Sequence, residues 1–307
     1  MVKLSIITIN YNNAEGLRRT LASVASQTYR DIEHIIVDAA STDGSVDIIR
    51  EYAEGNTSNI KHNTSHTIIW SSEKDKGIYD GMNKGIEIAL GRRIVNSFNR
   101  SELVEDKNKG KENKVGAEYI QILNSGDILA ADNVTERMLS ALDEKHNPDL
   151  LYGNMVHVDA QGNPISKSTE VEYSLRQYYS STINHDCSYI RRDVYERYGL
   201  YDENLKIVSD WKWFLQTIGL GNVKPVYVDI DVTHFDMSGI SERNLELRNK
   251  ERRQVLEELL PPAVLADYDK YAFISTQYDR LKKYHLWGIV YFVERALFKL
   301  NKWGVLR

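Results

Sequence analysis

Residues 34–44 read HIIVDAASTDG and residues 119–127 read YIQILNSGD, and in each stretch an apolar run leads into a loop that holds a carboxylate. The carboxylates are Asp38 and Asp127, and their loops are rich in Ser, Gly or Asn. Short runs of β-branched residues of this kind predict buried strands. Ligands of open α/β sheets bind at the carboxyl ends of the strands. We therefore expect both carboxylates at one sheet edge, around a ligand or a cation.

The pattern around these strands predicts an α/β fold with a doubly wound, mostly parallel sheet and helices on both faces. In the first half we expect strands at 4–9, 34–37, 68–70 and 119–123, and helices at 15–27, 45–52 and 80–89. Beyond residue 130 we expect strands at 150–158 and 226–233 and helices at 192–199 and 210–218. From residue 242 onward the pattern predicts a helical extension, which is broken at Pro261-Pro262.

An insertion is predicted at about 92–117. Its central part, residues 101–114, carries 8 charges in 14 positions and has almost nothing to bury. Such a segment favours a solvated, mobile loop, and the alternative is a partner-binding segment.

The composition is that of a folded protein, with 307 residues, 42% hydrophobic and 27% charged. The net charge of −5 provides no general basic field, so we expect no nucleic-acid partner. Cys187 is the one cysteine, which excludes an intrachain disulfide and favours a reducing, cytoplasmic location. The N-terminus becomes polar too early for a signal peptide, and no run approaches the roughly 20 apolar residues of a membrane span.

Two residues suit a nucleotide base. Tyr11 follows the first strand and could stack on a flat ring, while Asp38 could accept a hydrogen bond from an imide N–H such as that of uracil. This pairing favours a UDP-sugar as the nucleotide-sugar ligand. The alternatives are a tyrosine at the edge of the core and an aspartate that caps a helix.

Residues 73–85, EKDKGIYDGMNKG, combine acids, bases and glycines around a helix start. This composition suits a diphosphate, because N-terminal amides and Lys favour anions there. The candidate residues for nucleotide-sugar binding are Asp75, Lys76, Asp80 and Asn83. A capped helix with a flanking ion pair is the alternative.

Asp127 is the candidate metal ligand. Mn²⁺ or Mg²⁺ held by one carboxylate and several waters would neutralise a diphosphate leaving group. His234 is a weaker candidate for a second ligand, since a histidine beside a strand also packs in cores.

Asp210, in the run VSDWKW, is a candidate general base or a helix cap. We expect the neighbouring aromatic residues to raise its pKa by desolvation and to stack on a sugar.

The blocks TINYNN, VDAASTDGS, EKDKGIYDGMNKGIEIA and YIQILNSGD, the stretch 184–215 and the block FDMSGIS follow one another over residues 1–242. Together they resemble glycosyltransferase family 2. The resemblance implies a GT-A fold, a nucleoside-diphosphate-sugar donor, a divalent metal and inversion at the anomeric carbon. It also implies that Tyr11 and Asp38 hold the base, that Asp127 holds the metal and that Asp210 is the catalytic base.

Two positions depart from the family pattern. The metal loop has Asn124, Ser125 and Gly126 where an acidic pair or triplet is usual, so Asn124 stands at the ribose contact. Ser209 precedes the base where Glu is common.

On this basis we expect a nucleotide-sugar-binding half at 1–127, an acceptor-binding half of the same domain at 128–242 and a C-terminal helical segment at 243–307. The expected reaction adds a single sugar to a glycan or lipid-linked acceptor in bacterial surface-polysaccharide assembly. The alternatives are a sugar nucleotidyltransferase and a catalytically decayed nucleotide-sugar-binding protein. The nucleotidyltransferase would need a Gly-rich, Arg-containing loop after the first strand, and NYNNAEG does not provide one.

Residues 280–307 hold seven Lys or Arg and one Glu, for a net charge of +6, with five Trp, Tyr or Phe after residue 286. A basic, aromatic helix is typical of a segment that lies in a membrane interface. We therefore expect peripheral contact with the inner face of the cytoplasmic membrane. The alternative is a helix that packs on the catalytic domain or on a second subunit of a homodimer.

Overall fold

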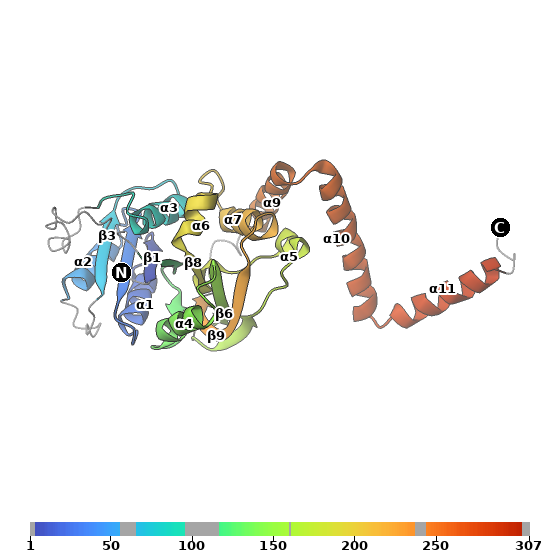
Figure 1. The fold of residues 1–307 in the computed structure, drawn as a ribbon, viewed down its shortest axis with the longest axis horizontal. Coiled ribbons are helices and arrows are strands. Elements are labelled where there is room, and N and C mark those ends of the chain that lie inside the picture. The colour runs from blue at the N-terminus through green and yellow to red at the C-terminus, as the bar shows by residue number, and fades with distance from the viewer. Residues whose placement is uncertain (1–3, 56–65, 96–116, 160, 237–243, 303–307) are drawn as a thin grey trace. The chain divides into compact units, whose positions relative to one another are not determined.

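The computed structural model describes residues 4–55, 66–95, 117–159, 161–236 and 244–302 (Figure 1). The chain divides into two compact units, Met1–Arg252 and Arg253–Arg307. Most of the expected insertion, including residues 101–114, lies outside the described residues, and so does most of the block FDMSGIS.

Four parallel strands build the first half of the sheet, in the order β3-β2-β1-β4. They are β1 (Leu4–Asn10), β2 (Ile32–Asp38), β3 (Thr67–Ser72) and β4 (Tyr119–Ile122). Nearly every residue of β1, β2 and β4 is buried, which explains their continuous apolar runs. The register pairs Asn10 with Asp38 and Asp38 with Ser72, so three polar side chains end adjacent strands at one edge.

The helices α1 (Ala14–Ala25) and α2 (Ser45–Glu54) cover one face of this sheet through Leu17, Leu21 and Ile49. On the other face, α3 (Ile78–Ala89) packs directly on β1 and β2. This helix approaches closely because Gly81 and Gly85 face β1: a Cβ at position 85 would overlap the side chain of Ile7. The close approach fixes the start of α3 beside the ends of the strands.

The second half continues the sheet as β8-β6-β9-β5, with β7 paired to β6. Its strands are β5 (Ile128–Leu129), β6 (Leu150–Val158), β7 (Pro164–Ser168), β8 (Ser188–Arg191) and β9 (Pro225–Asp236). β8 is antiparallel to β4 and β6, whereas β6 and β9 are parallel. The predicted α/β fold is confirmed, and the sheet as a whole is mixed because the second half contributes the antiparallel pairs.

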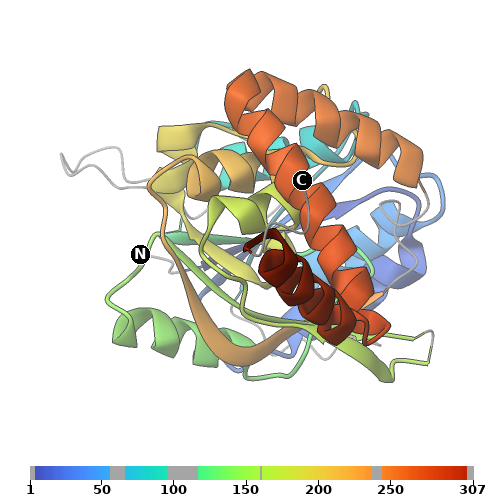
Figure 2. The same cartoon turned by 90° about the vertical axis from the view of Figure 1, so that its right-hand side faces the viewer.

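Among the described residues of the second half, five short helical segments and one π-helical turn flank the sheet. Helices α6 and α7 lie on the same side of the sheet as α3, and α4 lies on the opposite side (Figures 1 and 2). The segments are α4 (Val134–Glu144), α5 (Leu175–Ser180), the 3₁₀ turn η1 (His185–Cys187), α6 (Arg192–Tyr198), α7 (Ser209–Phe214) and the π turn η2 (Leu215–Gly219).

The sequence analysis did not predict β5, α4, β7, α5 or β8. Three of these are short: β5 has two residues, β8 has four and α5 has six, too few for a clear period. β7 is almost entirely exposed, so its sequence lacks the alternation of apolar and polar residues that indicates a half-buried strand. Tertiary contacts, not local pattern, define these four elements. Helix α4 is different, because it buries Val134, Met138 and Leu142 at helical spacing, and the sequence analysis overlooked this pattern.

The second unit is helical, as predicted. Helix α9 (Leu245–Leu259) enters it, and α10 (Pro262–Lys283) and α11 (Trp287–Lys302) follow. The predicted break is confirmed, because α10 begins at Pro262, where a missing N–H costs nothing. The basic segment, residues 280–307, is divided at His285, whose φ of +54° separates α10 from α11. None of the described helices is both long enough and apolar enough to cross a bilayer.

Candidate active site

Asp38 organises the carboxyl edge of the sheet. Its side chain is fully buried and accepts four hydrogen bonds, from Asn10 Nδ2 (2.8 Å), Ser41 Oγ (2.6 Å), Ser41 N (2.9 Å) and Ser72 Oγ (2.7 Å). Four is the usual capacity of a carboxylate. An imide N–H can therefore be accepted only when one of the two hydroxyl groups turns away. Asp38 thus fixes the ends of β1, β2 and β3 in addition to any contact with a base.

The loop after β1 is tied to both neighbouring loops. Asn12 accepts from the N–H of Thr42 (2.8 Å), and Asn13 donates to the carbonyl of Ser125 (2.9 Å). Asn13 also caps α1 by accepting from Gly16 N (3.2 Å). The backbone of residues 10–14 is therefore held in place on both sides.

Tyr11 lies in this fixed loop and is 66% exposed. Its neighbours Asn12 and Asn13 are anchored, whereas its own ring is largely accessible to solvent. An exposed aromatic ring on a rigid loop is a suitable platform for a planar base.

Asp75 and Asp80 gather at the start of α3 around one cation, Lys84. Asp80 lies 3.4 Å from Lys84 Nζ, and both side chains are nearly buried. Asp75 accepts from Gly77 N (3.0 Å), and burial raises the pKa of its carboxyl. The charges of Asp80 and Asp38 raise this pKa as well, which places all three acids in one neighbourhood.

Lys76 and Asn83 have other partners. The side chain of Lys76 is 78% exposed and forms an ion pair with Glu203 (3.4 Å). Asn83 is buried and pairs with the backbone of Tyr201, donating to its carbonyl (2.9 Å) and accepting from its N–H (3.0 Å). In this geometry Asn83 joins α3 to the second half of the domain and presents no free amide to a ligand.

Asp127 is 5% exposed and lies where the loop after β4 turns into β5. Thr20 on α1 donates to its carbonyl (2.7 Å) and accepts from Gly126 N (2.9 Å), so the loop is fixed by the helix below it. Its neighbour Ile128 pairs across the sheet with His234. This register places the weaker metal candidate on the strand beside Asp127.

Asp210, in the first turn of α7, is held by two residues that come from distant parts of the chain. The hydroxyl of Tyr79 on α3 donates to its Oδ1 (2.8 Å), and His185 Nδ1 lies 3.3 Å from its Oδ2. Its side chain keeps 21% exposure. The carboxylate is therefore engaged by other elements, and capping of its own helix does not account for its position.

His185 connects the groups of the site. Its Nε2 lies 3.3 Å from Asp186 Oδ1 and 3.1 Å from the side-chain amide of Asn124. Burial alone would lower the pKa of His185, but the charges of Asp186 and Asp210 outweigh it and raise the pKa to about 9. The charge of Asp127 raises the pKa further, so the cation responds to both the metal candidate and the base candidate.

The contact between His185 and Asp210 also changes the pKa of the Asp210 carboxyl. Burial would raise the pKa of Asp210, but the hydrogen bond and charge of His185, together with the Tyr79 hydroxyl, lower it below its ordinary value. The expectation of a raised pKa was wrong, because it counted aromatic neighbours and missed the imidazolium. Asp210 is consequently ionised throughout the neutral range.

The expectation that the neighbouring tryptophans stack on a sugar was also wrong. Trp211 and Trp213 are 2% and 1% exposed. Their indole N–H groups donate to the carbonyls of Tyr178 (2.8 Å) and Gly199 (2.9 Å). Both rings belong to the core that supports Asp210 from behind.

His185 was not singled out by the sequence analysis. The available signal was its position in the sequence NHDC, at the start of the long block 184–215 that also contains Asp210. A histidine next to an acid in a loop is common, and only the fold brings it to a residue 25 positions away.

The donor set around Asp127 suits one divalent cation with a small protein contribution. Among the described residues no three His, Cys, Asp or Glu side chains form a metal cage. Mg²⁺ and related ions in phosphate sites need only one or two carboxylates, with water and phosphate oxygens completing the shell. Asp127 meets that minimum.

Comparison with known proteins agrees with this architecture. Residues 5–97 match the family model described as Glycosyl transferase family 2. This match confirms the resemblance to glycosyltransferase family 2 that was found in the sequence.

Similar proteins extend the match beyond that segment. An uncharacterized glycosyltransferase of Mycobacterium tuberculosis is 27% identical over 244 residues, which are 77% of this chain and 76% of the relative. A PGL/p-HBAD biosynthesis glycosyltransferase of Mycobacterium bovis is 23% identical over 240 residues, 76% of this chain and 77% of the relative.

Solved structures share the fold at lower identity. Residues 1–349 of S. aureus TarS, in complex with UDP-GlcNAc, align with a TM-score of 0.59 at 18% identity, covering 87% of this chain and 70% of that one. Against a longer TarS chain the match spans 42% of its length. A mannosyltransferase of Pyrobaculum calidifontis, in complex with GDP-Man and Mn²⁺, aligns with a TM-score of 0.50 at 15% identity, covering 98% and 87%. The GT-A fold is thereby confirmed.

The ion pairs of His185 predict a specific pH dependence of stability. A folded-state pKa above the ordinary 6.5 means that the stabilisation is complete below about pH 6.5 and is lost as the pH rises through about 9. Between these values the free energy of unfolding of the wild type should fall relative to that of His185→Gln. The difference should reach about 3 kcal/mol at most, because each tenfold change in proton affinity is worth about 1.4 kcal/mol.

Urea unfolding at a series of pH values measures this difference. His157→Gln is the matched control, because His157 bonds to the hydroxyl of Ser168 (3.0 Å). Its curve should follow that of the wild type. Parallel curves for wild type and His185→Gln would show that His185 is not charged in the folded state.

Proposed function

We propose that this chain is an inverting glycosyltransferase that moves a sugar from a UDP-sugar to a hydroxyl group of a glycan or lipid-linked acceptor in surface-polysaccharide synthesis. The observation that carries the proposal is the position of Asp210. An ionised, partly exposed carboxylate is oriented by His185 and Tyr79, and His185 also responds to Asp127 in the donor half. The His185 cation thus interacts with both the proposed base, Asp210, and the proposed diphosphate-binding region at Asp127.

In this proposal the acceptor O–H gives its proton to Asp210 while the acceptor oxygen forms a bond to the anomeric carbon. The bond from that carbon to the diphosphate oxygen breaks, and UDP leaves with the electron pair. The transition state has oxocarbenium character, as in other glycosyl chemistry. His185 and Tyr79 hold the carboxylate in place, so that little reorganisation is needed when the proton moves.

The donor would bind along the ends of β1, β2 and β4. Tyr11 would stack on the base, and Asp38 would accept a hydrogen bond from the imide N–H at the edge of the base. Asp75, Asp80 and Lys84 surround the start of α3, where the sugar and diphosphate would lie. Asn124, which is fixed by His185, would face the ribose.

Asp127 would hold Mn²⁺ or Mg²⁺, and the bound ion would neutralise the charge of the departing diphosphate. His234 is placed to assist from the adjacent strand. The Mn²⁺ in the Pyrobaculum calidifontis complex supports a divalent ion in this fold.

The family match opposes the alternative of a sugar nucleotidyltransferase. A catalytically decayed binding protein remains the second candidate, because the metal loop holds one carboxylate. Turnover separates it from the proposed enzyme.

Replacing Asp210 tests the reaction directly. Asp210→Asn keeps the shape of the side chain and removes its basicity, so UDP binding should survive while sugar transfer falls by about 10²–10⁴-fold. Donor turnover and UDP affinity are measured side by side, with Asp193→Asn as the control for a carboxylate paired with Arg191 at 2.6 Å. Equal losses of affinity and rate in Asp210→Asn would indicate a structural role.

The exposed ring of Tyr11 allows a test of base stacking without a change in stability. Tyr11→Ala should weaken UDP binding by about 1–3 kcal/mol, the usual value of one base on one aromatic ring. Tyr11→Phe should bind UDP as the wild type does, and both variants should keep the wild-type Tm. Titration calorimetry provides the affinities, and an unchanged Kd in Tyr11→Ala would remove Tyr11 from the site.

Metal dependence should centre on Asp127. Asp127→Ala should abolish turnover and remove the Mn²⁺-dependent part of UDP binding, because the variant lacks the carboxylate proposed to hold the ion. The control is Asp132→Ala, in which the lost carboxylate accepts from Ser26 Oγ (2.7 Å). Near-normal activity of Asp127→Ala in EDTA would contradict the assignment.

We also propose that α11 binds the surface of an anionic membrane. The helix exposes several large apolar side chains, with Phe292 and Phe298 at 74% and 71%. Lys and Arg residues of the basic segment accompany them, and each is worth on the order of 1 kcal/mol near an anionic surface. Binding of α11 to the membrane surface would bring the protein close to a lipid-linked acceptor.

Liposome co-sedimentation tests this contact. Replacing Phe292 and Phe298 by Ser should release the protein from vesicles that contain anionic lipid, and high salt should weaken binding by the wild type. Phe273→Ser, which changes a 66% exposed Phe on α10, is the matched control and should stay bound. If the wild type ignores the vesicles, the proposed membrane contact is wrong.

A further inference from the structure

Two arginines on α9, Arg248 and Arg252, lie one helical turn apart on one face of the helix. Like charges at this spacing destabilise a helix. The Nε atoms of both guanidinium groups are buried without a hydrogen-bond partner, and no ion pair to a described carboxylate involves either residue. Burial, followed by the charge of Arg248, lowers the pKa of Arg252. The pair therefore provides a partly buried positive charge that forms no ion pair with a described carboxylate.

This charge lies beside the proposed catalytic base. The Arg252 guanidinium is 4.9 Å from the ring centre of Trp211, which follows Asp210 in the sequence, and it donates to the carbonyl of Ser180 (2.8 Å). The charge of Asp210 acts on Arg252 directly. Buried Glu251 fixes this end of α9 by accepting from the backbone N–H groups of residues 206 and 207.

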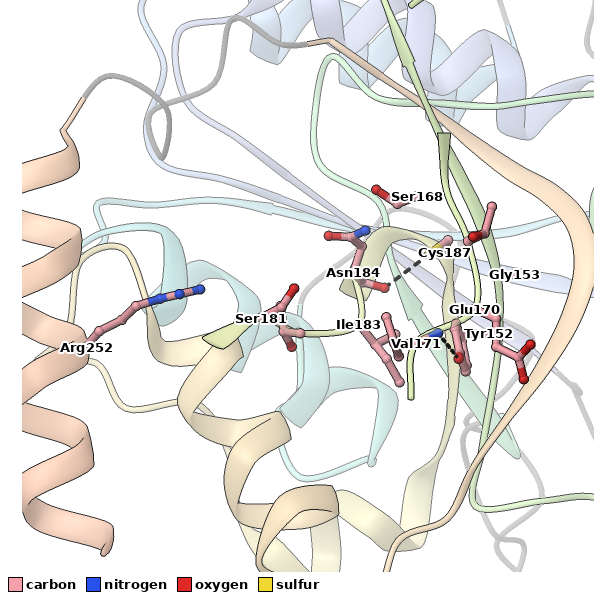
Figure 3. A pocket seen from close by; sticks show the side chains of 12 residues that line it. Tyr152, Gly153, Ser168, Glu170, Val171, Ser181, Ile183, Asn184, Cys187 and Arg252 are labelled. Atoms are coloured by element: carbon pink, nitrogen blue, oxygen red, sulfur yellow. Dashed lines mark hydrogen bonds between the residues drawn. The ribbon is translucent and has the colours of Figure 1, made fainter. Parts of the chain in front are cut away.

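Arg252 also lines a cavity of about 290 Å³, close to the lower end of the size range of small-molecule sites. Figure 3 shows Arg252 projecting from α9 toward Ser181, with Glu170 at the other side of the cavity. Asn184, which precedes His185, belongs to the wall as well. The cavity thus extends to the turn that orients Asp210.

The remaining wall is rich in hydroxyl groups. Ser168, Thr169, Ser181 and Thr182 contribute to it, and Thr182 Oγ1 is buried without a partner. Hydroxyl groups of this kind suit the polar rim of a sugar, while the arginine suits an anion that can be bound through two parallel N–H groups.

We propose that this cavity is the acceptor site and that Arg252 binds an anionic substituent, a phosphate or a carboxylate, on the acceptor glycan. The inference rests on the proposed glycosyltransferase function and adds the chemical class of its acceptor. The anion fills the position that Arg248 and Arg252 leave without a counter-charge, and the acceptor hydroxyl then lies toward Asp210. Glu170 repels a second anion at the far side, which fixes the direction in which the acceptor enters.

Three probes of equal ring size test the charge preference on the UDP-bound full chain: methyl glucopyranoside, methyl glucuronide and glucose 6-phosphate. Ligand-observed NMR titrations provide their Kd values. At least one anionic probe should bind tenfold or more tightly than the neutral one, and comparison of the two anionic probes distinguishes carboxylate from phosphate. Equal or undetectable binding of all three would overturn the inference.

Arg252→Gln should abolish the preference for the anionic probe. Arg253→Gln is the matched control, because Arg253 pairs with Glu257 (2.7 Å) and Asp269 (2.8 Å) and should leave the preference unchanged. A preference that survives in Arg252→Gln would contradict the assignment.

Glu170→Gln supplies a second variant in case Arg252→Gln does not fold. Removal of the opposing charge should tighten the anionic probe severalfold and leave the neutral probe unchanged; an unchanged anionic Kd would contradict the proposed orientation. The Kd for UDP, measured on every variant, distinguishes failure of the acceptor inference from failure of the proposed glycosyltransferase function. A wild type that binds UDP but shows no preference for an anionic probe overturns the acceptor class alone, whereas a wild type that binds no UDP overturns the glycosyltransferase proposal.

Discussion

The contact between the His185 imidazole and the Asp210 carboxylate is the interaction on which the site depends. At 3.3 Å it joins η1 to the start of α7, and the charge of His185 lowers the pKa of Asp210 despite burial. Three acids surround this one cation, and without it the acids would repel each other in a region of low polarity. The imidazole therefore orients the Asp210 carboxylate and favours its ionised form.

The frame around that contact comes from the register of the sheet. Parallel pairing of β1, β2 and β3 brings Asn10, Asp38 and Ser72 into one row, and the close packing of α3 on β1 sets Tyr79 where it can reach Asp210. The first half of the sheet domain thus contributes Tyr79, one of the two groups that hold the Asp210 carboxylate in the second half. This dependence explains why the two halves form one compact unit.

Much of this frame was predictable from the sequence. Buried strands have continuous apolar runs, so the placement of Asp38 and Asp127 at strand ends follows from local pattern and from the geometry of parallel sheets. Contacts across the domain were not predictable, because Tyr79 and Asp210 are 131 positions apart and meet only through the fold. The tryptophans beside Asp210 illustrate the opposite error: composition suggested a sugar platform, but both indoles are buried and donate to backbone carbonyls.

The stereochemistry of sugar release tests the proposed role of Asp210 as the general base of a single displacement. If Asp210 activates the attacking oxygen, one displacement must invert the anomeric carbon. Slow hydrolysis of a UDP-α-sugar, followed by ¹H NMR before the released sugar mutarotates, reports the first anomer formed. We expect the β-anomer from the wild type and almost no release from Asp210→Asn; an initial α-anomer would rule out a single displacement.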